Sequence, residues 1–396
     1  MTIRLRWCLC VAGLLVGQLA SVGSAWAGSS AGRPHGPVTA GHPVGLGKVL
    51  STSDGGQIFG WDINQNGTDG VLATSTTVDQ GYSVSMETFD QATAKITRTF
   101  KRYTGTRHSY LVDGIFAGDV GLVTHYVTLD GTIYPKRRYE LMHPVTAQRF
   151  TDSWTPPVRN FDVVQNAENQ STSTSVVYGI ELKHQGDPLL VVSDLAADTS
   201  TLIPLDRNTY GIGHAQVAQD TATNRAVLAA SGGAVGGPPP INALVNLSTG
   251  HVTEWNGLNN GPYGSGYVNG LAVDSGTGIA CTTTELNAQV EFYDLTKKTG
   301  IAVQFPGTGD ADQLNSGGAV ASDPVHHLFL VSDPLYAPTG GGAIVVYDEQ
   351  GGLVEAITGF HFGGFAQGPT RVAVNPELRM GWVDGPGINQ LQQFVY

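Results

Sequence analysis

Short apolar runs that end in Asp or Asn recur along the chain at a nearly constant spacing. The clearest are 270–274, 319–323 and 371–375, in which apolar residues lead into a polar residue and a turn. Seven end points can be aligned at intervals of 49 to 54 residues, and they are Asp62, Asp113, Asn166, Asp220, Asp274, Asp323 and Asn375. A fixed period of about 50 residues predicts a protein built from one repeated structural unit.

A second series of polar residues keeps the same period. Its members lie 48 to 54 residues apart, and they are Asp90, His143, Asp194, Asn246, Asp294 and Asp348. Between the two series lie apolar runs such as 289–293 and 344–347, so each period has room for about four short strands. Asp and Asn at a strand end favour Asx turns, in which the side chain bonds the backbone as the strand reverses. The pattern predicts an all-β fold of four-stranded antiparallel blades.

The number of repeats predicts a closed ring. The residues after Asn375 and those from about residue 28 to Asp62 together make one further period, and the chain stops at Tyr396, where the second series would continue. The last blade therefore lacks an outer strand, which segment 48–53 is expected to supply, so that no sheet edge stays exposed. We predict a seven-bladed β-propeller over residues 45–396, closed by this N-terminal strand. The blades are expected at 56–104, 107–155, 159–207, 212–257, 267–307, 315–359 and 368–396 with 45–53.

The N-terminus has the features of an export signal. Arg4 and Arg6 precede an apolar stretch over 7–20, and Ala25-Trp26-Ala27 supplies a small-x-small cleavage site. Residues 1–27 are therefore predicted to be a signal peptide, which makes the mature protein secreted or periplasmic. Residues 28–44 are rich in Gly, Pro and Ser and are predicted to be a flexible arm. No later apolar stretch is long enough to predict a membrane span.

Charge and cysteine content narrow the function classes. The net charge is −12, and it becomes more negative once Arg4 and Arg6 are removed. Nucleic acid is excluded as an expected partner, because phosphate binding needs a basic surface. Cys281 is the one cysteine left after cleavage, so no internal disulfide is predicted, and Cys281 is expected to be a small buried residue in a strand.

The best-preserved repeats resemble a known family. Gly270-Leu-Ala-Val-Asp274 followed by Val290-Glu-Phe-Tyr-Asp-Leu295 and Thr299-Gly300 is similar to the YVTN-type propeller repeat. That group also includes lactonase-like and NHL-like propellers, and the likeness is clearest over 212–396. The resemblance implies a propeller. It leaves the activity open, because such families include lactonases, lyases and binding proteins.

Polar residues in equivalent positions indicate a ligand site at one end of the central channel. His108, His214 and Asn269 each precede a first-series residue by five or six positions, so they would converge at the channel mouth. Tyr263 and His361 lie in long connectors that would cover it. The ligand would be a small molecule, a sugar or a protein. One alternative is a ring of polar groups around trapped water. Another is a lactonase- or lyase-like enzyme with a His base and a possible metal.

A second hypothesis concerns a metal. The segment 62–69 places oxygen ligands at Asp62, Asn64, Asn66 and Asp69, which resembles a calcium loop, and calcium is the one cofactor that the sequence suggests. The segment lacks the final Glu of an EF-hand, since Ala73 stands there, and Asn66-Gly67 is also a strong hairpin turn. His326 and His327 are expected in a strand, where adjacent side chains point to opposite faces and do not share a metal.

Overall fold

The computed structural model describes residues 44–396 apart from a set of short segments. Those outside the description are 54, 79–80, 107–108, 118–119, 128–135, 143–160, 173, 182–186, 195–196, 198, 211–214, 231–240, 259–267, 285–288, 307–317, 337, 340, 363–370 and 386–388. The predicted signal peptide and almost all of the predicted arm precede the described residues. Pro43–Tyr396 forms one compact unit.

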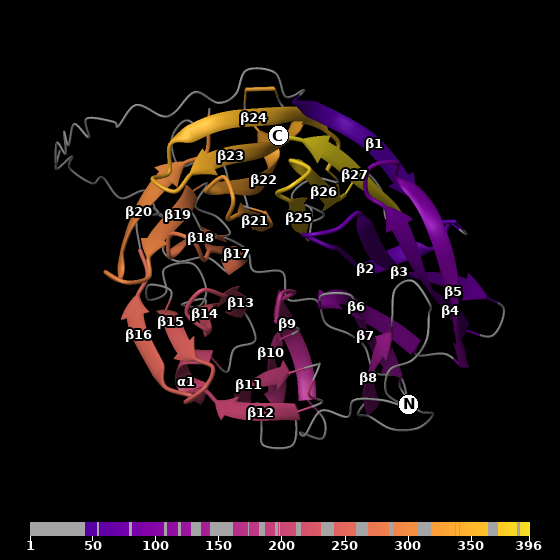
Figure 1. The fold of residues 1–396 in the computed structure, drawn as a ribbon, viewed down its shortest axis with the longest axis horizontal. Coiled ribbons are helices and arrows are strands. Elements are labelled where there is room, and N and C mark those ends of the chain that lie inside the picture. The colour runs from indigo at the N-terminus through magenta and orange to yellow at the C-terminus, as the bar shows by residue number, and fades with distance from the viewer. Residues whose placement is uncertain are drawn as a thin grey trace, which may run out of the picture. The chain divides into compact units, whose positions relative to one another are not determined.

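The described chain folds into antiparallel β-sheets that follow one another around a ring (Figure 1). The first four-stranded sheet is β2 (Gln57–Ile63), β3 (Asp69–Val78), β4 (Gly81–Asp90) and β5 (Lys95–Thr106). A three-stranded sheet follows, with β6 (Ser109–Ala117), β7 (Val120–Val127) and β8 (Lys136–Met142). The next four-stranded sheet is β9 (Phe161–Asn169), β10 (Thr174–Glu181), β11 (Asp187–Asp194) and β12 (Thr199–Pro204). A short helix α1 (Arg207–Tyr210) comes after it.

Three further four-stranded sheets and a closing sheet complete the order. They are β13 (Ala215–Asp220), β14 (Arg225–Ala230), β15 (Ile241–Asn246) and β16 (Val252–Asn256); β17 (Val268–Asp274), β18 (Ile279–Thr284), β19 (Gln289–Asp294) and β20 (Thr299–Gln304); and β21 (Val320–Asp323), β22 (Leu328–Tyr336), β23 (Gly341–Asp348) and β24 (Leu353–Phe360). The closing sheet joins β25 (Val372–Asn375), β26 (Met380–Asp384) and β27 (Gln390–Val395) to β1 (Gly45–Ser51).

The prediction of an all-β propeller with four-stranded antiparallel blades is confirmed, and six such blades are described. The three-stranded sheet lies between two of them, since β6 contacts β2 on one side and β9 on the other. Its strands fall within the interval predicted for the second of seven blades. Residues 143–160, where a fourth strand would fall, are outside the described part of the chain.

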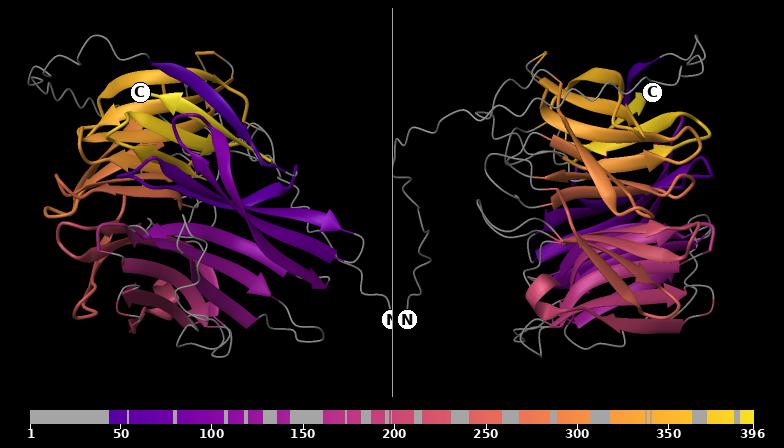
Figure 2. Two further views of the ribbon diagram at one scale, coloured as in Figure 1. Left: turned by 45° about the vertical axis from the view of Figure 1, so that its right-hand side comes forward. Right: turned by 90° about the vertical axis from the view of Figure 1, so that its left-hand side faces the viewer.

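The N-terminal strand closes the ring as predicted. β1 runs antiparallel to β27, with Gly45 opposite Val395 and Ser51 opposite Gln390, so the strand begins a few residues earlier than expected (Figure 2). Beside it, Trp61, Phe89 and Trp382 pack in a hydrophobic cluster that joins the first blade to the last. The Phe89 and Trp382 rings meet edge to face, with centroids 5.2 Å apart. Apolar packing therefore reinforces the strand pairing at the closure.

The blades give the ring two different faces. Every four-stranded blade except the closing one begins at its innermost strand in sequence and moves outward, so the innermost strands all run in the same sense (Figure 1). We call the end at which they begin the loop face, and the end at which they finish the turn face. On the turn face, the first two strands of four blades are joined by four-residue turns at 221–224, 275–278, 324–327 and 376–379.

Side chains of the repeat residues stabilise the turn face. Asp274 Oδ1 accepts a hydrogen bond from the Gly276 amide at 2.8 Å, and Asp323 Oδ1 accepts one from the Val325 amide at 3.0 Å. Both aspartates are fully buried. These contacts are the Asx turns expected from the sequence.

Two assignments within the repeat were wrong by two or three residues. In the first blade the residue that caps the turn is Asn64 and not Asp62, because the Asn66 amide donates to Asn64 Oδ1 at 3.1 Å. In the third, β9 continues past Asn166 and ends at Asn169, whose Oδ1 accepts the Ser171 amide at 3.1 Å. The first and third blades therefore carry longer innermost strands than the aligned repeat predicts.

Two further features concern buried side chains. Cys281 is buried in β18, as expected, and burial raises the pKa of its thiol. Trp61 and Trp382 are buried between the first and last blades, whereas Trp154 lies outside the described residues. Among the described residues there is no helix long and apolar enough to cross a membrane.

Candidate functional site

The predicted ligand site falls on the loop face, and only part of it is described. His108, His214 and Tyr263 lie outside the described residues. Asn269 and His361 are described, and both lie at the loop face. They come from different depths of the ring, since Asn269 is on the innermost strand β17 and His361 follows the outermost strand β24. At about 4.8 Å per strand, three strand spacings put the two at radii that differ by roughly 14 Å.

Asn269 occupies an irregular point of its strand. Val268 pairs with Thr284 and Gly270 pairs with Thr283, so Asn269 is an extra residue in the ladder. Bulges of this kind redirect a side chain and are common beside binding sites. Next to it, Gly270 lets two innermost strands approach closely, because a Cβ there would lie 2.7 Å from the Gly318 carbonyl oxygen. The inner end of the loop face is therefore closely packed between β17 and the residues before β21.

His361 is exposed at the outer edge of the loop face. Its neighbour Phe362 stacks on Phe360 with centroids 5.2 Å apart. Phe362 also lies over Gly342 and Gly385, where an added Cβ would come within 2.4 Å and 2.9 Å of its ring. The start of this connector is thus held across the boundary between the β21–β24 blade and the closing blade.

The connector that carries Tyr263 is tied to a buried acid. The Leu258 amide donates to the Tyr293 hydroxyl oxygen at 2.8 Å, and the Tyr293 hydroxyl donates to Glu291 Oε2. Glu291 is 1% exposed. Burial raises the pKa of Glu291 to about 7, and hydrogen bonds from Tyr293 and Thr282 act in the opposite direction. A group that titrates near neutral pH therefore lies under the base of a loop-face connector.

The predicted calcium loop is a hairpin, with Asn64 and Asn66 in the turn between β2 and β3 and Asp69 at the start of β3. Asp62 lies within β2, is buried and forms an ion pair with Arg371 at 2.9 Å. The turn carbonyl oxygens accept bonds from amide side chains: Gln91 Nε2 donates to Asn64 O at 2.8 Å, and Asn375 Nδ2 donates to Gly67 O at 2.6 Å. These contacts favour the hairpin-turn alternative, and calcium binding stays a prediction.

Asp69 has a different environment from Asp62. Its side chain is half-buried, and the pKa of its carboxyl is raised by burial and by the nearby charge of Asp90. Calcium binding at Asp69, as at Asp62, Asn64 and Asn66, stays a prediction.

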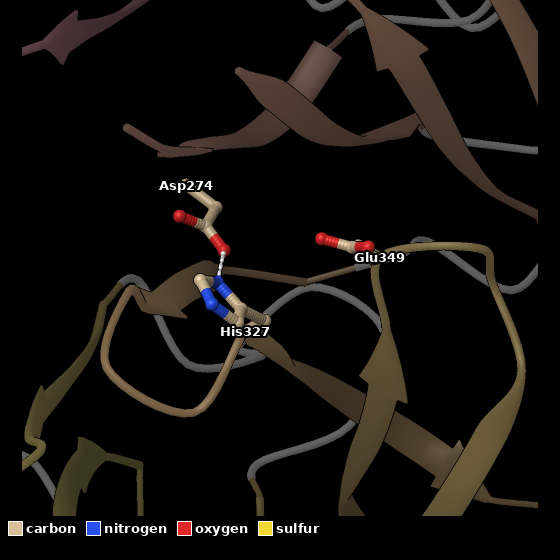
Figure 3. Close-up of side chains that lie close together, drawn as sticks. All are labelled: Asp274, His327 and Glu349. Atoms are coloured by element: carbon tan, nitrogen blue, oxygen red, sulfur yellow. Dashed lines mark hydrogen bonds and ion pairs between the residues drawn. The ribbon is translucent and has the colours of Figure 1, made fainter. Parts of the chain in front are cut away.

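A cluster that the sequence did not predict lies on the turn face. Asp274 at the end of β17, His327 in the turn before β22 and Glu349 in the turn after β23 each offer a ligand atom, and these atoms lie within 4.8 Å of one another (Figure 3). Asp274 Oδ2 and His327 Nδ1 share a hydrogen bond of 2.8 Å. The cluster joins the β17–β20 blade to the β21–β24 blade.

The two adjacent histidines are in a turn and not in the expected strand, because β22 begins at Leu328. They bond to different aspartates, His326 to Asp323 at 2.7 Å and His327 to Asp274 at 2.8 Å. One feature of the repeat could have indicated the cluster of Asp274, His327 and Glu349. The residue after the second-series Asp or Asn is Leu247 or Leu295 in two blades and Glu349 in a third, so an acid replaces an apolar residue there.

Comparison with known proteins supports the fold and gives no information on function. No protein family model and no curated protein matches this chain. Raptor from Chaetomium thermophilum is structurally similar, with a TM-score of 0.58 and 13% identity over 89% of this chain and 29% of the Raptor chain. U3-55K is similar with a TM-score of 0.59 and 10% identity over 89% of this chain and 98% of that one. This chain spans less than a third of Raptor, and at such identities the likeness shows a propeller fold alone.

Proposed function

We propose that this chain is an exported binding protein that holds a partner on its loop face, with a protein segment as the favoured partner. The observation that carries the proposal is the difference in connection length between the faces. Loop-face connectors such as 257–267, 305–319 and 361–371 contrast with the four-residue turns of the turn face. Long connections on a rigid scaffold usually carry function. Since these connectors leave the ring at several blade boundaries, the surface they span suits an extended partner.

The chemistry of the loop face favours an uncharged or basic partner. The described residues there include Asn269 and His361, which supply amide and imidazole groups. The chain as a whole carries a net charge of −12. An acidic protein attracts cationic partners and repels anionic ones over the range of its field.

The proposal includes three finer points. The β6–β8 sheet is the second of seven blades, with the bounds 107–155 expected from the sequence. The repeat belongs with YVTN-type propellers. Residues 1–27 direct export, so the mature protein begins at Gly28. N-terminal sequencing of protein recovered outside the cytoplasm tests the last point, and a start at Met1 would overturn it.

The binding test uses defined probes. Mature protein is applied to an array of basic, neutral and acidic peptides and to a glycan array, and the strongest probe is measured again in solution. We expect basic or neutral peptides to bind. His361→Ala combined with Asn269→Ala should weaken that binding, whereas His251→Ala, an exposed histidine on the turn face, should not. Equal binding by both variants would overturn the loop-face assignment.

The undescribed part of the predicted site needs its own variant. His108→Ala combined with His214→Ala tests the inner channel mouth, with the same probe and the same control. The enzyme alternative is tested on the same proteins with a panel of lactones. If wild type hydrolyses a lactone and the variant with His108→Ala and His214→Ala does not, the catalytic proposal replaces the binding proposal.

A further inference from the structure

One blade boundary on the turn face is polar where the preceding boundary is apolar. Leu295, after the second-series residue of the β17–β20 blade, is 1% exposed and packs against Val227 and Leu244 of the preceding blade. The equivalent Leu247 is also buried. In the β21–β24 blade this position holds Glu349. The repeat therefore directs a carboxylate toward the preceding blade at the point where its sister blades direct leucine.

Glu349 meets two other ligand groups there. Asp274, which is fully buried, comes from the preceding blade, and His327 comes from the turn of the same blade (Figure 3). Glu349 Oε1 accepts a bond from Gln350 Nε2 at 2.7 Å. Glu349 Oε2 is closed off from solvent and has no hydrogen-bond partner among the described residues. A buried carboxylate oxygen without a hydrogen-bond donor destabilises the folded state, and a bound cation or a donor would remove that cost.

The conformation of His327 is a second and independent feature. It has a φ of 57°, in the left-handed region that is costly for residues with a side chain. The equivalent turn positions hold Asn224, Gly278 and Arg379. Asn and Gly tolerate this conformation best. A histidine here therefore keeps an unfavourable backbone position while it places an imidazole against Asp274 of the preceding blade.

We propose that Asp274, His327 and Glu349 bind a divalent transition-metal cation, with zinc the best fit, and that the cation joins the two blades. One imidazole and two carboxylates form a ligand set that suits zinc, while calcium and magnesium prefer oxygen ligands alone. A tetrahedral zinc with bonds of about 2.0–2.1 Å sets its ligand atoms roughly 3.4 Å apart. The observed limit of 4.8 Å needs only a small closure of the Glu349 side chain. The cation offsets the two carboxylate charges, and a fourth position is left for water.

The neighbouring Asp323–His326 pair supplies a matched control. It has the same aspartate–histidine contact, at 2.7 Å, within the same turn. The Tyr396 hydroxyl donates to Asp323 Oδ2 at 2.9 Å, so both oxygens of that carboxylate have hydrogen-bond donors. No third ligand from Glu, Asp, Cys or His joins this pair in the described part of the chain. Substituting His326 therefore removes an adjacent imidazole and leaves the proposed site intact.

The experiment is calorimetric titration of zinc chloride into mature protein freed of metal by chelator and dialysis. Five proteins are compared: wild type, His327→Asn, Glu349→Gln, Glu349→Leu and His326→Asn. Asparagine is chosen at 327 because it tolerates a positive φ, and leucine at 349 because the repeat places leucine there. The melting temperature of each metal-free protein reports whether it is folded.

We expect wild type and His326→Asn to bind zinc alike and to gain thermal stability from it. His327→Asn and both Glu349 variants should bind at least about tenfold more weakly while staying folded. Glu349→Leu should melt no lower than metal-free wild type, because it replaces a buried charge with the side chain of the sister blades. Wild type without zinc binding, or equal zinc affinity in all five proteins, would overturn the proposal.

Discussion

The two faces of the ring differ in how their strands are connected, although the same repeat builds both. On the turn face, the first turns of the last four blades are four residues long and end in left-handed residues such as Asn224 and Gly278. In three of these blades a buried Asp or Asn side chain accepts a backbone amide of the turn. On the loop face, the connectors differ in length and composition from one blade boundary to the next. A tight turn must be satisfied in every blade, so its sequence recurs. A long connector carries no such requirement, which leaves it available for recognition.

The largest expected effect on stability comes from removing β1, the strand that closes the ring and so supports both faces. Deleting residues 28–54 from the mature protein leaves β27 with an unpaired edge and takes Leu50 out of the cluster around Trp382. We expect the melting temperature to fall by at least about 10 °C or the cooperative transition to disappear. Deleting only 28–43 keeps β1 and should leave the melting curve nearly unchanged. Equal curves for the two deletions would contradict the closure.

A smaller effect should come from Glu291, which couples a loop-face connector to the blade interior. Its pKa is raised to about 7 from an ordinary 4.5, so the folded state holds a proton that the unfolded state has lost between these values. This contribution is fully present below about pH 4.5 and is lost as pH rises toward 7 and beyond, by up to about 3 kcal/mol.

Glu291→Gln removes this titration. The free energy of unfolding, measured with denaturant at pH 5 and at pH 8, should rise in the variant relative to wild type by about 2 to 3 kcal/mol between these pH values. Glu377→Gln, at an exposed turn position, is the control. A variant whose stability changes with pH in parallel with that of wild type would show that Glu291 does not titrate in this range.

The turn face and the loop face should differ in what a single substitution costs. Asp323→Ala removes the acceptor for the Val325 and His326 amides and for the Tyr396 hydroxyl. We expect a loss of about 2 kcal/mol in the free energy of unfolding. Asp323→Asn keeps an acceptor and should lose less than about 1 kcal/mol. His361→Ala, on the loop face, should lose less than about 0.5 kcal/mol, because the side chain is exposed. Denaturant curves that rank the three in another order would break the comparison.

The smallest effect concerns calcium at the turn between β2 and β3. If Asp62, Asn64, Asn66 and Asp69 bind calcium, a calcium-selective chelator should lower the melting temperature by a few degrees, and Asp62→Ala should remove that response. Asp62→Ala also breaks the ion pair with Arg371, so its melting temperature without calcium is the reference. Identical chelator responses in the two proteins would leave the segment as a hairpin turn.

The parts of the fold that could be predicted are those the repeat dictates locally. Asp274, Asp323 and Asn375 end an innermost strand because each caps the turn that follows, so sequence spacing and structure agree there. Asp62 and Asn166 were misplaced because the first and third blades run on to Asn64 and Asn169. A period alone does not show such an extension.

The candidate sites were harder to predict because they depend on contacts between blades. Asp274 and Glu349 are distant in sequence and meet only because the ring brings adjacent blades together. His361 and Asn269 share a face, which strand direction predicts. Their different radii follow from which strand each one adjoins, and equal spacing from a marker residue does not determine that.

The most direct test of the division between the faces is a paired measurement of binding and stability. The strongest peptide from the array is titrated into Asn269→Ala/His361→Ala and into Asp323→Ala, and the melting temperature of both proteins is measured. We expect the loop-face variant to bind the peptide more weakly than wild type does. The turn-face variant should bind with the affinity of wild type and should melt lower than the loop-face variant. The reverse pattern, or two variants that lose affinity equally, would contradict the division between the faces.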